Sequence, residues 1–188
     1  MIENKEGIMA KKKIGTVWLG GCSGCHLSLL DIDERILDVA RLADIVKCPI
    51  VDGKEFPEVD IALVEGSVTS DEHLHEILHI RKQAKVLVAL GDCAVMTNVT
   101  GMRNYLQLNE VFDTAYVSAI SNDDLGSLPD HPALLRLHEK VFPLQEVVDV
   151  DYVIPGCPPS ADVIFYVLSE FLNDRVPDLS EVKKLKYG

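Results

Sequence analysis

The sequence predicts an α/β fold in which helices flank a parallel β-sheet. Strand-like apolar runs alternate with helical stretches at least three times along the chain, as in repeated βαβ units. Two of these runs are apolar almost without interruption, which is typical of central parallel strands buried on both faces. No internal repeat, low-complexity tract or linker divides the chain.

The first third of the chain is predicted to contain three strands and one helix. A β-rich run over residues 14–19 is followed by a helix over about residues 27–43, because apolar residues recur there near the helical period. Residues 45–51 form a second strand, which Pro49 places at an edge or a strand end. Residues 60–64 form the third strand, a fully apolar one.

A helix start is predicted at Ser70, because a serine followed by acidic residues caps a helix. This helix runs to about Gln83, with Leu74, Ile77 and Leu78 as its core stripe. Three prolines break residues 111–150 into short pieces that no periodicity defines. The remaining predicted elements are a strand over 85–90, a helix over about 94–106, a strand over 152–154 and a helix over about 160–172.

Length and composition predict one domain over residues 14–188 after an N-terminal tail of residues 1–13. The chain is 47% hydrophobic and 26% charged, as in ordinary globular proteins. A net charge of −12 argues against nucleic-acid binding, which requires a basic face. No secretory leader or membrane-spanning stretch is expected, so the sequence predicts a cytoplasmic protein without membrane partners.

Four of the five cysteines lie in loops directly after predicted strands. These four are Cys22, Cys25, Cys93 and Cys157. In a parallel sheet such loops share one edge, the edge at which ligands bind. We therefore expect the four thiols to converge there, in a compartment where cysteines serve metals or catalysis rather than disulfides.

Neighbouring residues suit a metal cluster at this edge. Glycines beside the cysteines allow close backbone approach, and helix starts after them are expected to lower the thiol pKa values. Pro158 follows Cys157, as a proline follows the last cysteine of bacterial ferredoxin motifs. Two alternatives stay open at this point: four small buried core residues, or a zinc or redox dithiol site, since one Cys-x-x-Cys is a weak signal. Cys48, inside a strand-like run, is interpreted as a structural thiol.

Four short motifs follow one another along the chain: Cys22-Ser23-Gly24-Cys25-His26, Glu65-Gly66-Ser67-Val68, Gly91-Asp92-Cys93-Ala94 and Pro155-Gly156-Cys157-Pro158-Pro159. Their order, context and spacing resemble the small subunit of nickel–iron hydrogenases over about residues 14–172. The run Cys-x-x-Cys-His-x-Ser-x-Leu-Asp-x-Asp-Glu, which ends at Glu34, looks most like the short subunit of cytoplasmic, bidirectional NAD(P)-linked hydrogenases.

This resemblance implies a flavodoxin-like, three-layer sandwich and one proximal [4Fe-4S] cluster held by Cys22, Cys25, Cys93 and Cys157. It also implies an obligate large subunit that carries the nickel–iron site, and diaphorase subunits with a flavin and further iron–sulfur clusters. Membrane-bound relatives have a cysteine-rich C-terminal domain for more clusters, which is not expected here. The alternatives are a complex I-like redox subunit, which usually has two adjacent cysteines at this point, and a zinc-stabilised scaffold domain.

Three further features complete the set of candidate sites. Glu65 and Asp92 lie at the same predicted edge and are candidates for proton handling or for supporting the cysteines. The segment from His75 to His79 matches the zinc-protease motif His-Glu-x-x-His. Because this helix lies between two strands, its histidines are interpreted as a solvated face. A tightly bound flavin is not expected, since the proposed cysteines occupy the loop after the first strand.

Overall fold

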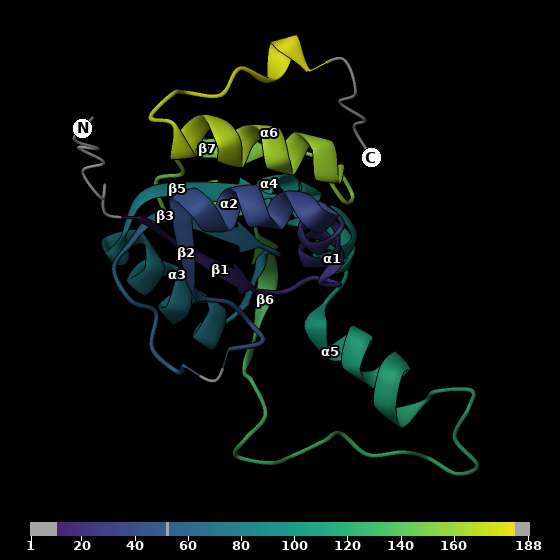
Figure 1. Ribbon diagram of the computed structural model, residues 1–188. Helices are drawn as coiled ribbons and strands as arrows, with labels where there is room; N and C mark the ends of the chain where they lie inside the picture. Colours follow the sequence, from purple (N-terminus) through teal and green to yellow (C-terminus); the bar gives the residue numbers. More distant parts are fainter. Residues whose placement is uncertain (1–10, 52, 183–188) are drawn as a thin grey trace, which may run out of the picture.

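The computed structural model describes residues 11–51 and 53–182. Five parallel strands form the main sheet in the order β2-β1-β3-β5-β7 (Figure 1). Taken in chain order, these strands have the flavodoxin-like order 2-1-3-4-5, so the predicted fold is confirmed. Their bounds are β1 (Lys12–Trp18), β2 (Ala43–Lys47), β3 (Val59–Glu65), β5 (Ala84–Leu90) and β7 (Tyr152–Ile154).

Helices cover both faces of the sheet. On one face lie α1 (Gly24–Leu30), α2 (Ile36–Leu42) and α6 (Ala161–Leu172); on the other lie α3 (Asp71–Gln83) and the short α4 (Asp92–Met96). Figure 1 shows α2 and α6 on the opposite side of the sheet from α3. The residues of β3 alternate between the two cores: Ile61 and Leu63 face the α1–α2–α6 side, and Ala62 and Val64 face the α3 side. Burial on both faces explains the unbroken apolar run at residues 61–64.

Two long helices predicted from periodicity are each divided. The predicted helix over 27–43 consists of α1, a 3₁₀ turn at Asp33–Arg35 and α2. The predicted helix over 94–106 consists of α4 and a 3₁₀ stretch at Asn98–Tyr105. Residues with positive φ lie at both breaks, at 53° for Asp33 and 68° for Thr97, and a right-handed helix cannot continue through them.

The first and second strands also begin earlier than predicted. β1 starts at Lys12, inside the predicted tail of residues 1–13, and the first ten residues of that tail lie outside the described residues. β2 occupies Ala43–Lys47 and ends before Pro49, where the Val51 amide donates to the Cys48 carbonyl in a turn. The edge position predicted for this strand is confirmed.

Helix starts agree with the sequence. The Ser70 hydroxyl accepts a hydrogen bond from the His73 amide at the start of α3, and Ser160 does the same for the Val163 amide of α6. The predicted core stripe of α3 is partly wrong, because Ile80 rather than Leu78 is buried beside Ile77. Leu78 instead faces solvent.

The region without clear periodicity contains a second, smaller sheet. β4 (Val68–Ser70) pairs antiparallel with β6 (Leu137–Phe142), and a 3₁₀ turn follows at Leu144–Glu146. Between Asn98–Tyr105 and β6 the chain forms α5 (Leu108–Phe112), a π-helical turn at Asp113–Val117 and a long irregular segment. In Figure 1, α5 and this segment stand away from the sheet and its helices. Within the described residues, no helix combines the length and apolar character needed to cross a membrane.

Candidate metal centre

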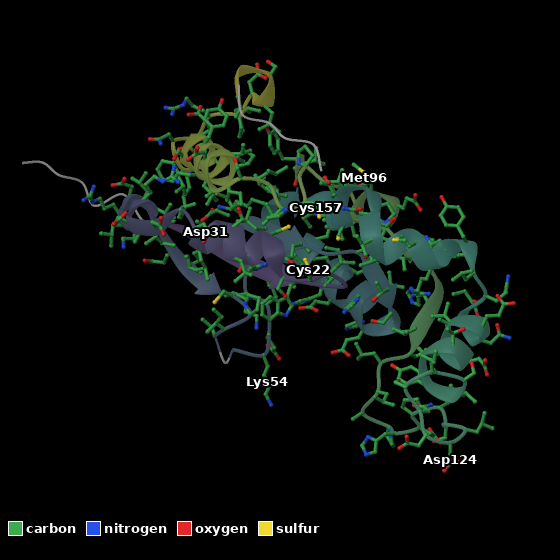
Figure 2. The ribbon with its side chains drawn as sticks, turned by 90° about the vertical axis from the view of Figure 1, so that its right-hand side faces the viewer. Cys22, Asp31, Lys54, Met96, Asp124 and Cys157 are labelled. Atoms are coloured by element: carbon green, nitrogen blue, oxygen red, sulfur yellow. The ribbon has the colours of Figure 1, made fainter. Side chains whose placement is uncertain are left out.

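The four predicted cysteines lie at one edge of the sheet. Cys22 and Cys25 follow β1, Cys93 follows β5, and Cys157 follows β7. Because these strands are parallel, their carboxyl ends meet at the same edge. Figure 2 shows the labelled side chains of Cys22 and Cys157 in the same part of the molecule.

The other cysteines contribute to the raised pKa values of Cys25 and Cys93. Burial raises the pKa of Cys25 far above its ordinary value, and the charges of Glu65, Cys93, Cys22 and Cys157 raise it further. The pKa of Cys93 is also raised, first by burial, then by Cys157 and Cys22 and by the two nearby carboxylates. The lowered pKa values expected from helix starts are therefore wrong for Cys25 and Cys93 in the metal-free chain, since desolvation outweighs helix amides here.

The positions of Cys25 and Cys93 explain part of the difference between the expected and the observed direction of their pKa shifts. Each is the second residue of a short helix, α1 or α4, rather than a residue ahead of it. Cys25 is buried and Cys93 half-buried, whereas Cys22 and Cys157 are exposed. The candidate centre thus has a closed side within the fold and an open side facing outward.

Glu65 connects the end of β3 to the start of α1. Its side chain is buried, and its Oε2 accepts a hydrogen bond from the His26 amide at 2.6 Å and pairs with the His26 Nδ1 at 2.5 Å. The His26 ring also packs edge-on against Trp18, with ring centroids 5.5 Å apart. Since His26 follows Cys25 directly, these contacts fix the backbone that carries this cysteine.

Asp92 connects the Cys93 loop to the Cys157 loop. Its Oδ1 accepts a hydrogen bond from the Gly156 amide at 2.6 Å, and its own amide donates to the Gly156 carbonyl at 2.9 Å. Asp92 is buried, so both bonds form away from bulk water. The structure therefore gives Glu65 and Asp92 positioning contacts beside the cysteines, while the proton-handling hypothesis for both remains a prediction.

Two positioning residues, His26 and Ser28, were not predicted as site residues. The buried Ser28 hydroxyl donates to the Pro159 carbonyl at 2.5 Å, which joins α1 to the loop of Cys157. The signal for His26 is its place after the second cysteine of Cys-x-x-Cys. Ser28 belongs to the same Cys-x-x-Cys-His-x-Ser run, but its partner lies 131 residues along the chain, so the sequence does not reveal this contact.

Two glycines allow the loops to approach so closely. A Cβ at Gly91, where φ is 82°, would lie 2.2 Å from the Cys25 Sγ. A Cβ at Gly66, where φ is 85°, would lie 2.8 Å from the backbone of Leu19. A side chain at either position would be strained and would push the cysteine-bearing loops apart.

Among residues 11–51 and 53–182, no group of three or more His, Cys, Asp or Glu side chains is placed to hold one metal ion. Cys48 lies beyond β2, half-buried, and is absent from the charges that act on Cys25 and Cys93.

The His-Glu-x-x-His segment lies on α3, apart from the cysteines. Its two histidines, His75 and His79, are exposed, and Ile77 and Ile80 of the same helix pack against the sheet. The His79 Nε2 lies 3.2 Å from the Phe56 carbonyl, to which it can donate a hydrogen bond. The solvated-face interpretation of these histidines agrees with their exposure.

Comparison with known sequences places these motifs in a family. Residues 22–171 match the family described as NADH ubiquinone oxidoreductase, 20 Kd subunit. The chain is 40% identical over 178 residues to a subunit of the F420-non-reducing hydrogenase of Methanothermobacter thermautotrophicus, covering 92% of this chain and 58% of that protein. It therefore spans somewhat over half the length of that relative. It is also 40% identical over 179 residues to the delta subunit of the NAD-reducing hydrogenase HoxS of Cupriavidus necator, covering 94% of this chain and 84% of that protein.

Solved structures show the same fold. A chain in a crystal structure of NAD+-reducing [NiFe]-hydrogenase in the H2-reduced state superposes with a TM-score of 0.90 at 36% identity, covering 95% of this chain and 99% of that one. A chain of the [NiFeSe]-hydrogenase of Dm. baculatum superposes with a TM-score of 0.55 at 17% identity, covering 92% of this chain and 68% of that one, which shows the fold alone. The inferred resemblance to hydrogenase small subunits is thus confirmed. The chain belongs to the NADH ubiquinone oxidoreductase 20 Kd subunit family, in which its similar relatives include subunits of NAD-reducing and F420-non-reducing hydrogenases.

Proposed function

We propose that this chain is the electron-transferring small subunit of an NAD(P)-linked [NiFe] hydrogenase. In this proposal Cys22, Cys25, Cys93 and Cys157 together hold one [4Fe-4S] cluster. The observation that carries it is the convergence of four thiols, from three parallel strands, at one edge of the sheet. Four thiolates are the usual ligands of such a cluster, which when bound accepts and passes single electrons.

The raised thiol pKa values fit a site that is completed by metal. Burial and the neighbouring charges raise the pKa values of Cys25 and Cys93 and so disfavour their thiolates. Cys22, Cys25, Cys93 and Cys157 would hold the cluster as thiolates, so its binding would be accompanied by proton release and would stabilise the fold. Glu65 and Asp92 hold the loops in place through His26 and Gly156. Hydrogen bonds to the cysteine sulfurs, and the solvent exposure of these sulfurs, would set the reduction potential of a bound cluster.

The partners follow from the same proposal. A large subunit supplies the nickel–iron site where hydrogen is split, and diaphorase subunits with a flavin and further clusters receive the electrons. The names of the HoxS relative and of the NAD+-reducing structural neighbour support an NAD-linked complex. We also place the complex in the cytoplasm.

A complex I-like subunit without hydrogen chemistry is the second candidate, and the description of the matching family favours it. The separated Cys22 and Cys25 and the hydrogenase relatives favour the first. A zinc-stabilised scaffold that uses the same four thiolates is the remaining alternative, and zinc analysis of the purified chain tests it.

Isotope exchange in the complete complex separates these functions. The wild-type complex should reduce NAD+ or NADP+ with hydrogen and also exchange hydrogen with D2O at the nickel–iron site. Cys93→Ser should abolish dye and nucleotide reduction while exchange persists, since exchange needs no electron exit. Cys48→Ser is the matched control and should keep both activities. A complex that transfers electrons from NADH but neither oxidises nor exchanges hydrogen would favour the complex I-like function.

A further inference from the structure

A long insertion stands away from the body of the fold. We define the arm as residues 106–136, all of which the structure describes; none of them is buried. It contains α5, the π-helical turn at Asp113–Val117 and the irregular segment before β6. Figure 1 shows it extending from the sheet and its helices, with none of the described elements packed over it. Many of its large apolar side chains are therefore exposed in the described part of the chain.

The arm nevertheless has internal structure. The Gly126 amide donates to the Val117 carbonyl at 2.9 Å, and the Asn122 Nδ2 donates to the Tyr116 carbonyl at 3.1 Å. These bonds fold the segment back on itself. Its exposed large apolar side chains are Leu106, Tyr116, Ile120, Leu125, Leu128, Leu134 and Leu135. A preformed apolar surface of this extent marks an interaction site.

Both ends of the arm continue into elements of the main fold. Its first end continues from α4, which carries Cys93, and its second end enters β6, which pairs with β4 just after Glu65-Gly66-Ser67. The two ends are also joined to each other: the Arg103 Nη1 donates to the His138 carbonyl at 2.7 Å. The arm thus follows along the chain from the segment that carries Cys93.

An exposed apolar strip connects the two regions. After Cys93 the chain exposes four large apolar side chains before the arm begins: Met96, Val99, Met102 and Tyr105. Figure 2 shows Met96 close to Cys157 and Asp124 at the far end of the arm. Exposed apolar side chains thus follow one another along the chain from the segment after Cys93 into the arm.

We infer that the arm is a binding surface for the large subunit, which also covers the cysteine edge. This inference rests on the proposed function, because it takes that partner from it. The arm carries five acidic residues and one basic residue, Arg136. The receiving surface on the large subunit is therefore apolar, with Lys or Arg side chains at its rim.

A second copy of this chain fits the arm less well. A two-fold contact would bring the same acidic patch of both chains together, and each chain has a net charge of −12. Like charges across an interface oppose association. The large subunit, by contrast, already has to approach the cysteine edge for electron transfer.

The test uses the full chain in complex with its large subunit. In the arm variant, Ile120→Asp and Leu125→Asp replace side chains that are 104% and 82% exposed, so the fold of the free chain should not change. In the matched control, Leu37→Asp and Val176→Asp replace exposed side chains outside the arm and the cysteine edge. Circular dichroism and iron content establish that each chain is folded and loaded. The dissociation constant for the large subunit should rise about tenfold or more in the arm variant alone, as for a central apolar contact.

Amide hydrogen exchange over residues 113–136 gives a second readout, and should slow when the large subunit binds. A wild-type dissociation constant in the arm variant, or unchanged exchange in the complex, would overturn the inference. So would a free wild-type chain that dimerises through the arm, with the dimer lost in the arm variant. Failure of the proposed function is distinguishable, because the wild-type complex itself would then neither oxidise hydrogen nor exchange it with D2O, whatever the arm variant does.

Discussion

Replacing Gly91 by alanine adds a methyl group where the fold leaves no room for one. Gly91 has φ 82° and ψ 162°, a region that residues with a side chain adopt only under strain. The added Cβ would lie 2.2 Å from the Cys25 Sγ, whereas ordinary contact begins at 3.4 Å. The thiol or the Gly91 backbone must therefore move by about 1 Å, and the Gly156 carbonyl at 3.4 Å closes the other direction.

The expected effect has two parts. Backbone strain of about 1–3 kcal/mol lowers the melting temperature by roughly 2–12 °C, since 1 kcal/mol corresponds to about 2–4 °C in a domain of this size. Displacement of the Cys25 thiol also removes one point of the four-cysteine arrangement, so iron content should fall sharply. Thermal melting of the metal-free chain measures the first part, and iron and sulfide analysis after anaerobic preparation measures the second.

Gly53→Ala is the matched control, because no atom lies within 4 Å of a Cβ built there. This variant should keep wild-type iron content and melt at or slightly above the wild-type temperature. A Gly91→Ala chain with wild-type iron content and wild-type melting temperature would refute the reasoning. Loss of stability with full iron content would show that strain is real but that the Cys25 thiol can adapt.

Three further predictions concern residues away from the cysteines. Leu63→Ala removes a fully buried side chain from β3 and should lower the free energy of unfolding by about 2–5 kcal/mol in urea titrations. Leu37→Ala, at an exposed position, should change this free energy by less than about 0.5 kcal/mol. Equal effects of the two substitutions would be inconsistent with the described core. His75→Ala should leave iron content and melting unchanged because the imidazole is exposed, whereas loss of a bound metal would make His-Glu-x-x-His a real site. Burial, with a smaller contribution from His138, holds the pKa of His73 below its ordinary 6.5. As the pH falls, the unfolded chain therefore protonates at His73 before the folded chain does. The stability that the neutral ring contributes is present above pH 6.5 and is lost as the pH falls. His73→Gln should accordingly lose less melting temperature than the wild type on acidification, and identical losses would contradict this assignment.

Much of the fold could be predicted from local signals. Ser70 and Ser160 cap helices that begin where the sequence places them, because capping depends on a few adjacent residues. The division at Asp33 was not predictable, since apolar periodicity continues through it and a single left-handed residue leaves no periodic trace. β4 and β6 were missed because they pair with each other across a long insertion that no local signal spans.

The candidate site shows the same division between local and distant information. The cysteines could be placed at one edge because each follows a predicted parallel strand. The contacts that position them could not, because Glu65 meets His26 across 39 residues and Asp92 meets Gly156 across 64. The direction of the Cys25 pKa shift depends on burial, which only the packed fold determines.

The most direct test of a four-cysteine cluster is the metal content of the anaerobically prepared chain, measured with Mössbauer spectroscopy across cysteine variants. The wild type should contain about four irons and four sulfides per chain, with the spectrum of a [4Fe-4S] site. Cys93→Ser or Cys157→Ser should lose most of this iron, and Cys48→Ser should retain it. One zinc per chain in place of iron, or a requirement for Cys48 as strict as that for Cys93, would contradict the assignment.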